Sequence, residues 1–315
     1  MLLQSTCLVY FHIIFQIVWI LFLKNVHLRF QSFMKNSVLI LYRQDEMDNT
    51  LIKYLLEQYD IFIPVMALLA AVVFITLHFV EAGYGITFDK KWGLAINNKV
   101  AWLCMESPVF ILMTVLCLLS PRMSPFNRAT SAVPFLMFLF FQTHYIRRSF
   151  IFPFLLKGKS KMPVTVMLMG VLFNLCNAFM QGGWLFYKSP GDMYSTSWLW
   201  SPQFIVGSII FFGGMTLNIQ SDKIIQDLRK PGDSNHYLPA KGLFRYVTGA
   251  HYFGELIEWT GFAILTWSIP GAVFALWTFA NLTPRANAIY KKYIKMFGIE
   301  TIKEKKLKRI IPRLY

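Results

Sequence analysis

The chain has 315 residues, of which 56% are hydrophobic and only 15% are charged, and its formal net charge is +15. A soluble domain usually carries about 25% charged residues, so this composition excludes a water-soluble protein with a surface of ordinary size and indicates a multi-span membrane protein. The excess positive charge does not indicate a nucleic-acid partner, because basic residues of membrane proteins collect in cytoplasmic loops and tails.

Long apolar stretches follow one another along the chain, and each is close to the roughly 20 residues that a membrane-spanning helix needs. The expected spans are Cys7–Leu23, Ile61–Val80, Val100–Ser120, Ser131–Leu156, Pro163–Tyr187, Gln203–Gln220, Gly242–Thr260 and Gly261–Leu282. The sequence Trp267–Gly271 interrupts the last apolar stretch and predicts the tight turn of a helical hairpin. The predicted fold class is therefore all-α integral membrane, a seven-helix bundle with an additional N-terminal hydrophobic segment.

The first apolar stretch is interpreted as lying outside the functional core. It is short, and no positively charged segment precedes it, so it is a poor signal peptide. Translation from Met47 would leave the seven-helix bundle alone. We expect an N-terminal extension and connector over residues 1–60, with or without one extra hydrophobic helix, and a seven-helix domain with a basic tail over residues 61–315.

The basic residues are distributed unevenly between the two sides of such a bundle. With seven helices, one side and the C-terminal tail carry 20 lysines and arginines, whereas the connections on the other side carry Arg122, Arg128 and Lys188. The positive-inside rule then predicts a multi-pass protein with a cytoplasmic C-terminus, in the endoplasmic reticulum of a eukaryote or the inner membrane of a bacterium. Five basic residues within 24–60, on the presumed outer side, contradict this orientation.

Ionisable residues interrupt the apolar stretches, and inside a membrane such residues are costly and mark a site by default. Glu106 lies one position before a Ser-Pro step, and Tyr145 stands between His144 and two arginines. Further along, spacings of three or four residues place paired polar residues on one helix face. These are Asn218 with Asp222 and Glu255 with Glu258, while His251 and Arg285 complete the set.

Several of these residues also have a purely structural interpretation. Arg147 and Arg148 are placed to extend toward the membrane interface, and a lone tyrosine such as Tyr145 is typical of an interfacial anchor. Asp222 is placed to cap a helix end, and Glu255 and Glu258 to pair with Arg245 or a neighbouring helix. The groups are more numerous than packing requires, so we favour a polar cavity that opens toward the basic, cytoplasmic side.

Motifs for nucleotides and metals are absent from the sequence. It contains no GxGxxG after a strand, no Walker loop, no HExxH and no CxxC, and its four cysteines lie in apolar runs. We therefore expect no metal site and no Rossmann or P-loop fold. A basic pocket still suits an anionic cofactor, with arginine and asparagine in place of a glycine-rich turn.

Several short segments resemble the steroid 5-alpha-reductase (3-oxo-5-alpha-steroid 4-dehydrogenase) family. The specific block runs from residue 218 to 259 and consists of Asn218–Asp222, Leu228–Asp233, Gly242–Val247 and Tyr252–Trp259. The similarity extends over roughly Phe62 to Tyr315. It also includes Ala101 and Trp102 with Glu106 and Pro108, His144 and Tyr145 with Arg148, Asn177 with Gln181, Lys295–Phe297 and Ile310–Pro312.

The resemblance implies a seven-helix membrane enzyme of steroid metabolism that takes NADPH from the cytoplasm and reduces the C4–C5 double bond of a 3-oxo-Δ4-steroid. We expect it to be a monomer. Glu106 and Tyr145 match the family's pair that engages the 3-oxo group, and a phenol hydrogen-bonded to a carboxyl is suited to polarise a carbonyl. Hydride then adds at the enone β carbon. The positions that match the family's cofactor-binding residues are Trp102, Arg148, Asn218, Asp222, Arg229, Glu255, Arg285 and Tyr293. Among these, Arg229 together with the adjacent Lys230 is suited to bind a phosphate group. Glu258 is assigned to packing around the site.

The sequence departs from the family at positions near the expected site. Met105 stands where the family usually has glutamine, His251 where it has asparagine, and Ile289 lies in a run that lacks the family's histidines. Met169 and His236 also differ. Three alternatives therefore stay open: an enoyl-thioester or other enone-lipid reductase of the same membrane superfamily, an isoprenylcysteine-type methyltransferase, whose His-x-x-x-Glu pattern is not evident, and a non-catalytic lipid-binding or transport protein.

Overall fold

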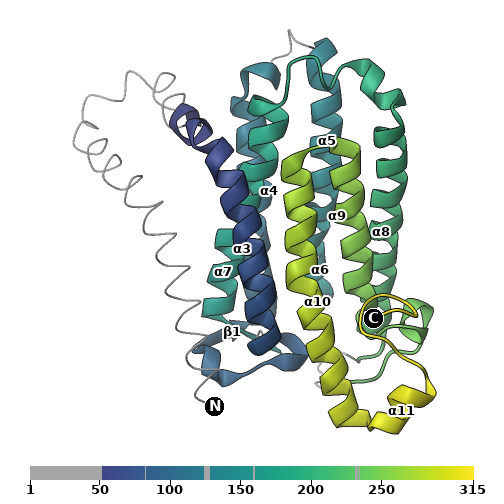
Figure 1. Ribbon diagram of the computed structural model, residues 1–315. Helices are drawn as coiled ribbons and strands as arrows, with labels where there is room; N and C mark the ends of the chain where they lie inside the picture. The colour runs from purple at the N-terminus through teal and green to yellow at the C-terminus, as the bar shows by residue number, and fades with distance from the viewer. Residues whose placement is uncertain (1–51, 82, 124–127, 159, 231–232, 234) are drawn as a thin grey trace.

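The computed structural model describes residues 52–81, 83–123, 128–158, 160–230, 233 and 235–315 (Figure 1). Seven of the helices in these ranges have 17 to 29 residues, and Figure 1 shows them running side by side as one bundle. They are α3 (Tyr59–Phe79), α4 (Asn98–Leu119), α5 (Arg128–Ile146), α7 (Val164–Gly183), α8 (Pro202–Asp227), α9 (Ala250–Thr266) and α10 (Ile269–Phe297). The expected span Cys7–Leu23 lies outside the described residues.

Shorter elements cover the end of the bundle at the bottom of Figure 1. Strand β1 (Ala95–Asn97) pairs antiparallel with β2 (Lys161–Pro163), with Ile96 opposite Met162. The tail beyond α11 (Ile299–Glu304) is tied to the start of α9, because Gly249 N donates to the Arg309 carbonyl at 2.8 Å. The other short helices are α6 (Phe152–Leu155) and turns at Gly85–Thr87, Lys90–Trp92, Pro121–Met123, Arg147–Ile151, Trp184–Lys188, Thr196–Trp200 and Gly242–Arg245.

Within the described ranges, four helical segments are long and apolar enough to cross a membrane: Tyr59–Phe79, Asn98–Leu119, Val164–Lys188 and Pro202–Asp227. Their outward side chains suit lipid, since Ile61 and Leu68 on α3 are each 67% exposed. The expectation of a helical membrane protein is therefore confirmed, while the number of spans stays a prediction.

The expected boundaries agree with the structure for α3 and α4 and are wrong in the last hairpin. The stretches Ile61–Val80 and Val100–Ser120 agree with α3 and α4 to within two residues. The predicted boundary between residues 260 and 261 is wrong: α9 continues to Thr266, and the break lies at Trp267, whose φ is 46°. Ser268 caps α10 there by accepting from Gly271 N, as the predicted turn at 267–271 requires.

The expected helix ends at Leu282 and Gln220 are wrong, because both helices continue with more polar residues beyond their apolar stretches. Helix α10 extends to Phe297 and buries one face of its second half, which includes Arg285, Ile289 and Tyr293. Helix α8 likewise continues to Asp227. The expected span Ser131–Leu156 is also not one α-helix, because a π-helical turn at Arg147–Ile151 separates α5 from α6.

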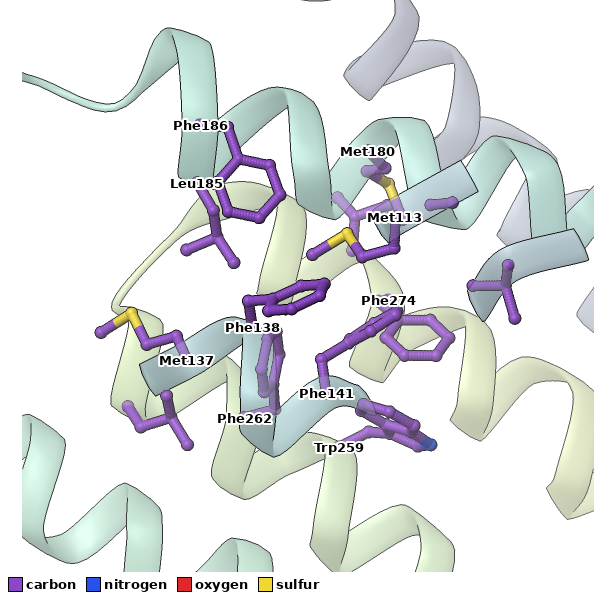
Figure 2. Packing of buried hydrophobic residues seen from close by; sticks show 14 of the residues in the cluster. Met113, Met137, Phe138, Phe141, Met180, Leu185, Phe186, Trp259, Phe262 and Phe274 are labelled. Carbon is purple, nitrogen blue, oxygen red and sulfur yellow. The ribbon is translucent and has the colours of Figure 1, made fainter. Parts of the chain in front are cut away.

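Aromatic side chains from three helices fill the middle of the bundle (Figure 2). Phe141 of α5 lies against Trp259 and Phe262 of α9, with ring centroids 5.6 Å apart in both cases. Phe274 of α10 packs on Trp259 at 4.4 Å. The ring of Tyr145, one turn beyond Phe141, lies on this cluster at 4.7 Å from Phe141. The Tyr145 ring therefore packs against the aromatic core of the bundle.

Helices α8 and α9 approach each other so closely that their backbones touch. A Cβ built on Gly214 of α8 would overlap the backbone nitrogen of Glu258, and one on Gly254 of α9 would overlap that of Asn218. Gly207 and Gly261 make the same kind of contact further along the pair. Small residues permit this distance in membrane bundles, and here it sets polar residues of α8 beside those of α9.

Replacing Gly214 by alanine should destabilise the bundle, because a new methyl group must displace backbone rather than a flexible side chain. We expect a loss of about 1–3 kcal/mol, the usual cost of overpacking, measured by thermal unfolding in detergent. Gly213→Ala is the matched control: this neighbour is exposed and a Cβ there meets nothing within 4 Å. Equal melting temperatures for the two variants would contradict the backbone contact.

Candidate active site

A cavity of about 580 Å³ extends inside the bundle, bounded by residues of all seven long helices and of the connector after α3. Nine of the ten residues predicted for the catalytic and cofactor sites line it, and Asn218 does not. The nine are Trp102, Glu106, Tyr145, Arg148, Asp222, Arg229, Glu255, Arg285 and Tyr293. Residues separated by almost 200 positions in the sequence therefore meet in one space.

Glu106 is buried in the wall formed by α4 and is held there by an amide of α7. Its Oε2 accepts a hydrogen bond from Asn174 Nδ2 at 3.1 Å, and the same nitrogen donates to the Met105 carbonyl at 2.8 Å. Trp102 lies one turn before Glu106 and faces the same cavity. Gly170 of α7 leaves room for the Met105 side chain, which a Cβ at that position would overlap.

Tyr145 lies near the end of α5, and its hydroxyl is also bonded to α7. Asn177 Nδ2 donates to Tyr145 Oη at 3.1 Å, and the tyrosine is only 3% exposed. The expected hydrogen bond between the phenol and the Glu106 carboxyl is not formed; each group is bonded instead to its own asparagine. The two side chains still face the same cavity.

His144 and Glu258 form a buried pair beside Tyr145. His144 Nδ1 lies 2.8 Å from Glu258 Oε1, and the two side chains are 6% and 0% exposed. The His144 ring also packs edge-on against Trp259, with centroids 4.6 Å apart. Pairing of Glu258 with a neighbouring helix is thus observed, which agrees with the packing role predicted for it.

Two consecutive arginines reach the same carboxylate because they lie in the π-helical turn. Arg147 Nη2 donates to Asp222 Oδ2 at 2.8 Å, while Arg148 Nη1 lies 3.7 Å from that oxygen. Arg148 Nη2 lies 3.6 Å from Glu255 Oε2, and its guanidinium stacks 4.5 Å above the Trp102 ring. π-turns occur often at functional sites. The alternative of arginines extending to the membrane interface is therefore not what the structure shows.

Asn218 does not line the cavity but is bonded to the network of arginines and carboxylates that does. Its Oδ1 accepts from Arg147 Nη1 at 3.1 Å, and its Nδ2 donates to the His251 carbonyl at 2.9 Å. Asp222 lies inside α8, which continues to Asp227, so the interpretation of Asp222 as an end cap is wrong. Both residues depend on the close approach of α8 to α9.

Arg285 of α10 is enclosed by two tyrosines. Its Nε donates to Tyr252 Oη at 3.1 Å, and its guanidinium lies 3.6 Å from the centre of the Tyr84 ring. Burial raises the pKa of Tyr84 to about 12, with Arg285 opposing the shift, so this phenol stays neutral. Arg285 Nη1 is buried without a hydrogen-bond partner among the described residues. A cationic donor is therefore available at the cavity.

The end of the cavity near α8 is basic and closer to solvent. Arg229 and His236 line it, and Arg229 Nε donates to the Asn235 carbonyl at 2.9 Å. Partial burial and the charges of Arg229 and Lys292 hold the pKa of His236 below its usual value. Asn235 N and the Tyr237 hydroxyl donate to Asp233, which lowers the pKa of that carboxyl. Lys230, predicted alongside Arg229, is exposed and does not line the cavity.

Three residues of the site were missed by the sequence analysis. Asn174 was detectable, because it precedes Asn177 by three residues on a largely apolar helix and shares its face. Tyr252 belongs to the motif Tyr252–Trp259, but no role in the site was predicted for it. Tyr84 lies in the irregular connector between α3 and α4, where no periodicity indicates which side chains point inward.

Comparison with known proteins gives a consistent result. A family model described as 3-oxo-5-alpha-steroid 4-dehydrogenase matches residues 160–315. The human 3-oxo-5-alpha-steroid 4-dehydrogenase 1 is 37% identical over 222 residues, which are 70% of this chain and 82% of that protein. The bovine protein of the same name is 34% identical over 73% of this chain and 87% of its own length. Steroid 5-alpha-reductase DET2 of Arabidopsis thaliana is 36% identical over 76% of this chain and 90% of its own length.

Removing the Glu258 carboxylate should destabilise the protein strongly, because buried His144 would lose its partner. We expect Glu258→Leu to lower the free energy of unfolding by about 2–5 kcal/mol, measured by thermal unfolding in detergent. Asp60→Asn is the control, since the Lys188–Asp60 pair has the same 2.8 Å separation but side chains that are 29% and 74% exposed, and it should change stability little. Similar losses for the two variants would refute the importance of burial.

Proposed function

The chain belongs to the 3-oxo-5-alpha-steroid 4-dehydrogenase (steroid 5-alpha-reductase) family, and from that premise we propose that it uses NADPH to reduce the C4–C5 double bond of 3-oxo-Δ4-steroids to 5-alpha-dihydrosteroids. The observation that carries the proposal is one cavity that joins Glu106 and Tyr145 to three arginines, Arg148, Arg229 and Arg285. An apolar enone and a polyanionic cofactor find complementary groups in that space.

The residues present fit a phosphorylated dinucleotide. Arg285 offers a buried Nη1 without a hydrogen-bond partner in the described part of the chain, and Arg229 lies at the basic end, where guanidinium groups suit phosphate oxygens. The residues that would hold NADPH are Trp102, Arg148, Asp222, Arg229, Glu255, Arg285 and Tyr293, with Asn218 acting through Arg147 and the His251 carbonyl. When bound, NADPH supplies the hydride that adds to the enone β carbon.

The protein's own groups polarise the substrate. Tyr145 donates its phenol proton as a hydrogen bond to the 3-oxo oxygen and stabilises the negative charge that develops there. Glu106 lines the same cavity, and in its protonated form it donates a second hydrogen bond to that carbonyl. Trp259 and Phe274, which line the cavity, exclude water, so these hydrogen bonds act in a medium of low dielectric.

We propose that all seven long helices cross the membrane and that the C-terminus is cytoplasmic. The proposal is supported by the four long apolar helices found among the described residues. It is also supported by the basic residues Lys157, Arg229 and Lys292 at the end of the bundle where the cavity meets Arg229 and His236. A cytoplasmic opening would admit NADPH, and the apolar part of the cavity would receive a membrane-borne steroid. A monomer suffices, because one chain supplies every residue of the site.

Another enone lipid is the second candidate substrate. Met105 and Met169 line the cavity where the family carries other side chains, and thioether side chains accept varied apolar shapes. A substrate panel separates the two candidates: NADPH oxidation by the purified protein with testosterone or progesterone, with product identified by mass spectrometry, compared with other enone and enoyl lipids.

Substitution of the two carbonyl-engaging residues tests the mechanism. Glu106→Gln and Tyr145→Phe should each lower turnover by about 10²–10³-fold, within the range for lost general acid–base groups. Stabilisation of the fold by NADPH should persist, because neither change removes a cation. The measurement is steroid-dependent NADPH oxidation alongside thermal unfolding with and without NADPH. Normal turnover in either variant would remove that residue from the mechanism.

The affinity for NADPH should depend on pH through His236. In the free protein its pKa is lowered by burial and by Arg229 and Lys292; a bound phosphate would raise that pKa, so binding takes up a proton. Affinity should therefore rise as pH falls from about 8 toward 6. Titration of NADPH at several pH values should give a flatter profile for His236→Asn. An unchanged profile would show that His236 is not near phosphate.

A further inference from the structure

Three buried amide side chains form a polar row on one face of α7. Asn174, Asn177 and Gln181 are 5%, 0% and 1% exposed, and their spacing of three and four residues aligns them along the helix. Polar groups in an apolar span are costly unless hydrogen-bonded. Gln181 is bonded to Asn177 and to a backbone carbonyl, Asn177 is bonded to Tyr145, and Asn174 is bonded to a backbone carbonyl and to Glu106.

The direction of the hydrogen bonds in this row is fixed by its anchor. Gln181 Nε2 donates to the Pro270 carbonyl at 2.9 Å, and a carbonyl oxygen can only accept. The same NH₂ group points its second hydrogen at Asn177 Oδ1, 3.5 Å away. Asn177 must then direct its own NH₂ group toward Tyr145 Oη, at 3.1 Å. The orientation is thus transmitted from the first turn of α10 to the phenol.

The phenol consequently acts as an acceptor toward α7. A tyrosine hydroxyl has one hydrogen to donate, and within the described residues the structure gives that hydrogen no protein acceptor. Because Tyr145 lines the cavity, the hydrogen is available to a carbonyl bound there. The bond from Asn177 also stabilises negative charge on the phenol oxygen as its proton shifts toward the substrate.

Asn174 holds Glu106 by the same principle. The Met105 carbonyl accepts one hydrogen of the Asn174 amide at 2.8 Å, which leaves the other for Glu106 Oε2 at 3.1 Å. One face of one helix thus sets the orientation of both groups, although Glu106 and Tyr145 belong to different helices.

We propose that the amide row of α7 consists of positioning residues for the reduction: Gln181 and Asn177 orient the Tyr145 hydroxyl so that it donates to the substrate, and Asn174 orients Glu106. The inference rests on the proposed function, because it gives Tyr145 a carbonyl to engage. A purely structural row would hold α7 against α10 without affecting the direction in which Tyr145 donates.

Gln181→Glu is the sharpest test, because it reverses the direction of the hydrogen bonds between residue 181, Asn177 and Tyr145 while the side chain keeps its size and shape. A buried, protonated glutamate has a single O–H to donate to the Pro270 carbonyl, so it offers Asn177 an acceptor oxygen. Asn177 then turns its amide over and accepts from Tyr145. We expect kcat to fall about 10- to 100-fold with KM changed by less than about threefold. Asn177→Leu should have a similar effect by removing the donor, with Asn177→Ser as the substitute if the leucine variant does not fold.

Gln142→Glu is the matched control. Gln142 on α5 is also a buried amide whose Nε2 donates to a backbone carbonyl, that of Phe110, at 3.0 Å, but it is not bonded to Tyr145. It should cost stability without lowering kcat. Each variant is first shown to be stabilised by NADPH, so that only folded protein is compared.

Combination with Tyr145→Phe distinguishes positioning from structure. Without the hydroxyl, Gln181→Glu and Asn177→Leu should cause no further loss of kcat, because the group they orient is gone. Losses that multiply in the Tyr145→Phe background, or an effect of Gln181→Glu no larger than that of Gln142→Glu, would overturn the inference while the proposed function stands. Full turnover in Tyr145→Phe alone would overturn the inference and remove Tyr145 from the mechanism, whereas no steroid-dependent turnover in the unmodified protein would overturn the proposed function.

Discussion

The backbone contact between α8 and α9 is the constraint on which the site depends. Glycines on both helices let the chains touch, so Asn218 lies close enough for its side chain to bond the His251 carbonyl. At any larger separation this bond would be lost, and Asn218 would no longer hold Arg147 in place beside Asp222. The position of the charged network therefore follows from small residues that carry no chemistry themselves.

Charge balance explains why the cavity is both cationic and apolar. Asp222 and Glu255 are paired with Arg147 and Arg148, and Glu258 is paired with His144. Among the described residues, Arg229 and Arg285 form no ion pair, so no carboxylate neutralises their charges at the cavity. The remainder is lined by Met105, Phe173 and Trp277, among other apolar side chains. The cavity thus offers cationic groups to an anionic ligand and apolar walls to an apolar one, and Glu106 and Tyr145 line the same space.

Much of this arrangement could be predicted because it depends on local patterns. Hydropathy located α3 and α4 to within two residues, and nine of the ten site residues identified from the family motifs line the cavity. The errors arose where long-range contacts determine the helix boundaries. Helix α10 continues beyond its apolar stretch because one of its faces packs against the C-terminal tail. The π-helical turn at 147–151 has no sequence signature. The absent bond between Glu106 and Tyr145 is of the same kind, since each side chain found a partner on a third helix.

The departures from the family pattern are tolerable for a physical reason. At Met105 and at His251, the groups that hold the site are main-chain carbonyls, which bond Asn174 and Asn218 respectively. A backbone carbonyl is present whatever the side chain, so methionine and histidine preserve both hydrogen bonds. The third departure, Ile289, only lines the cavity, where an apolar side chain alters shape rather than the network. These substitutions are therefore expected to adjust which lipid binds and to leave the reductive chemistry in place, which argues against a site that has lost its function.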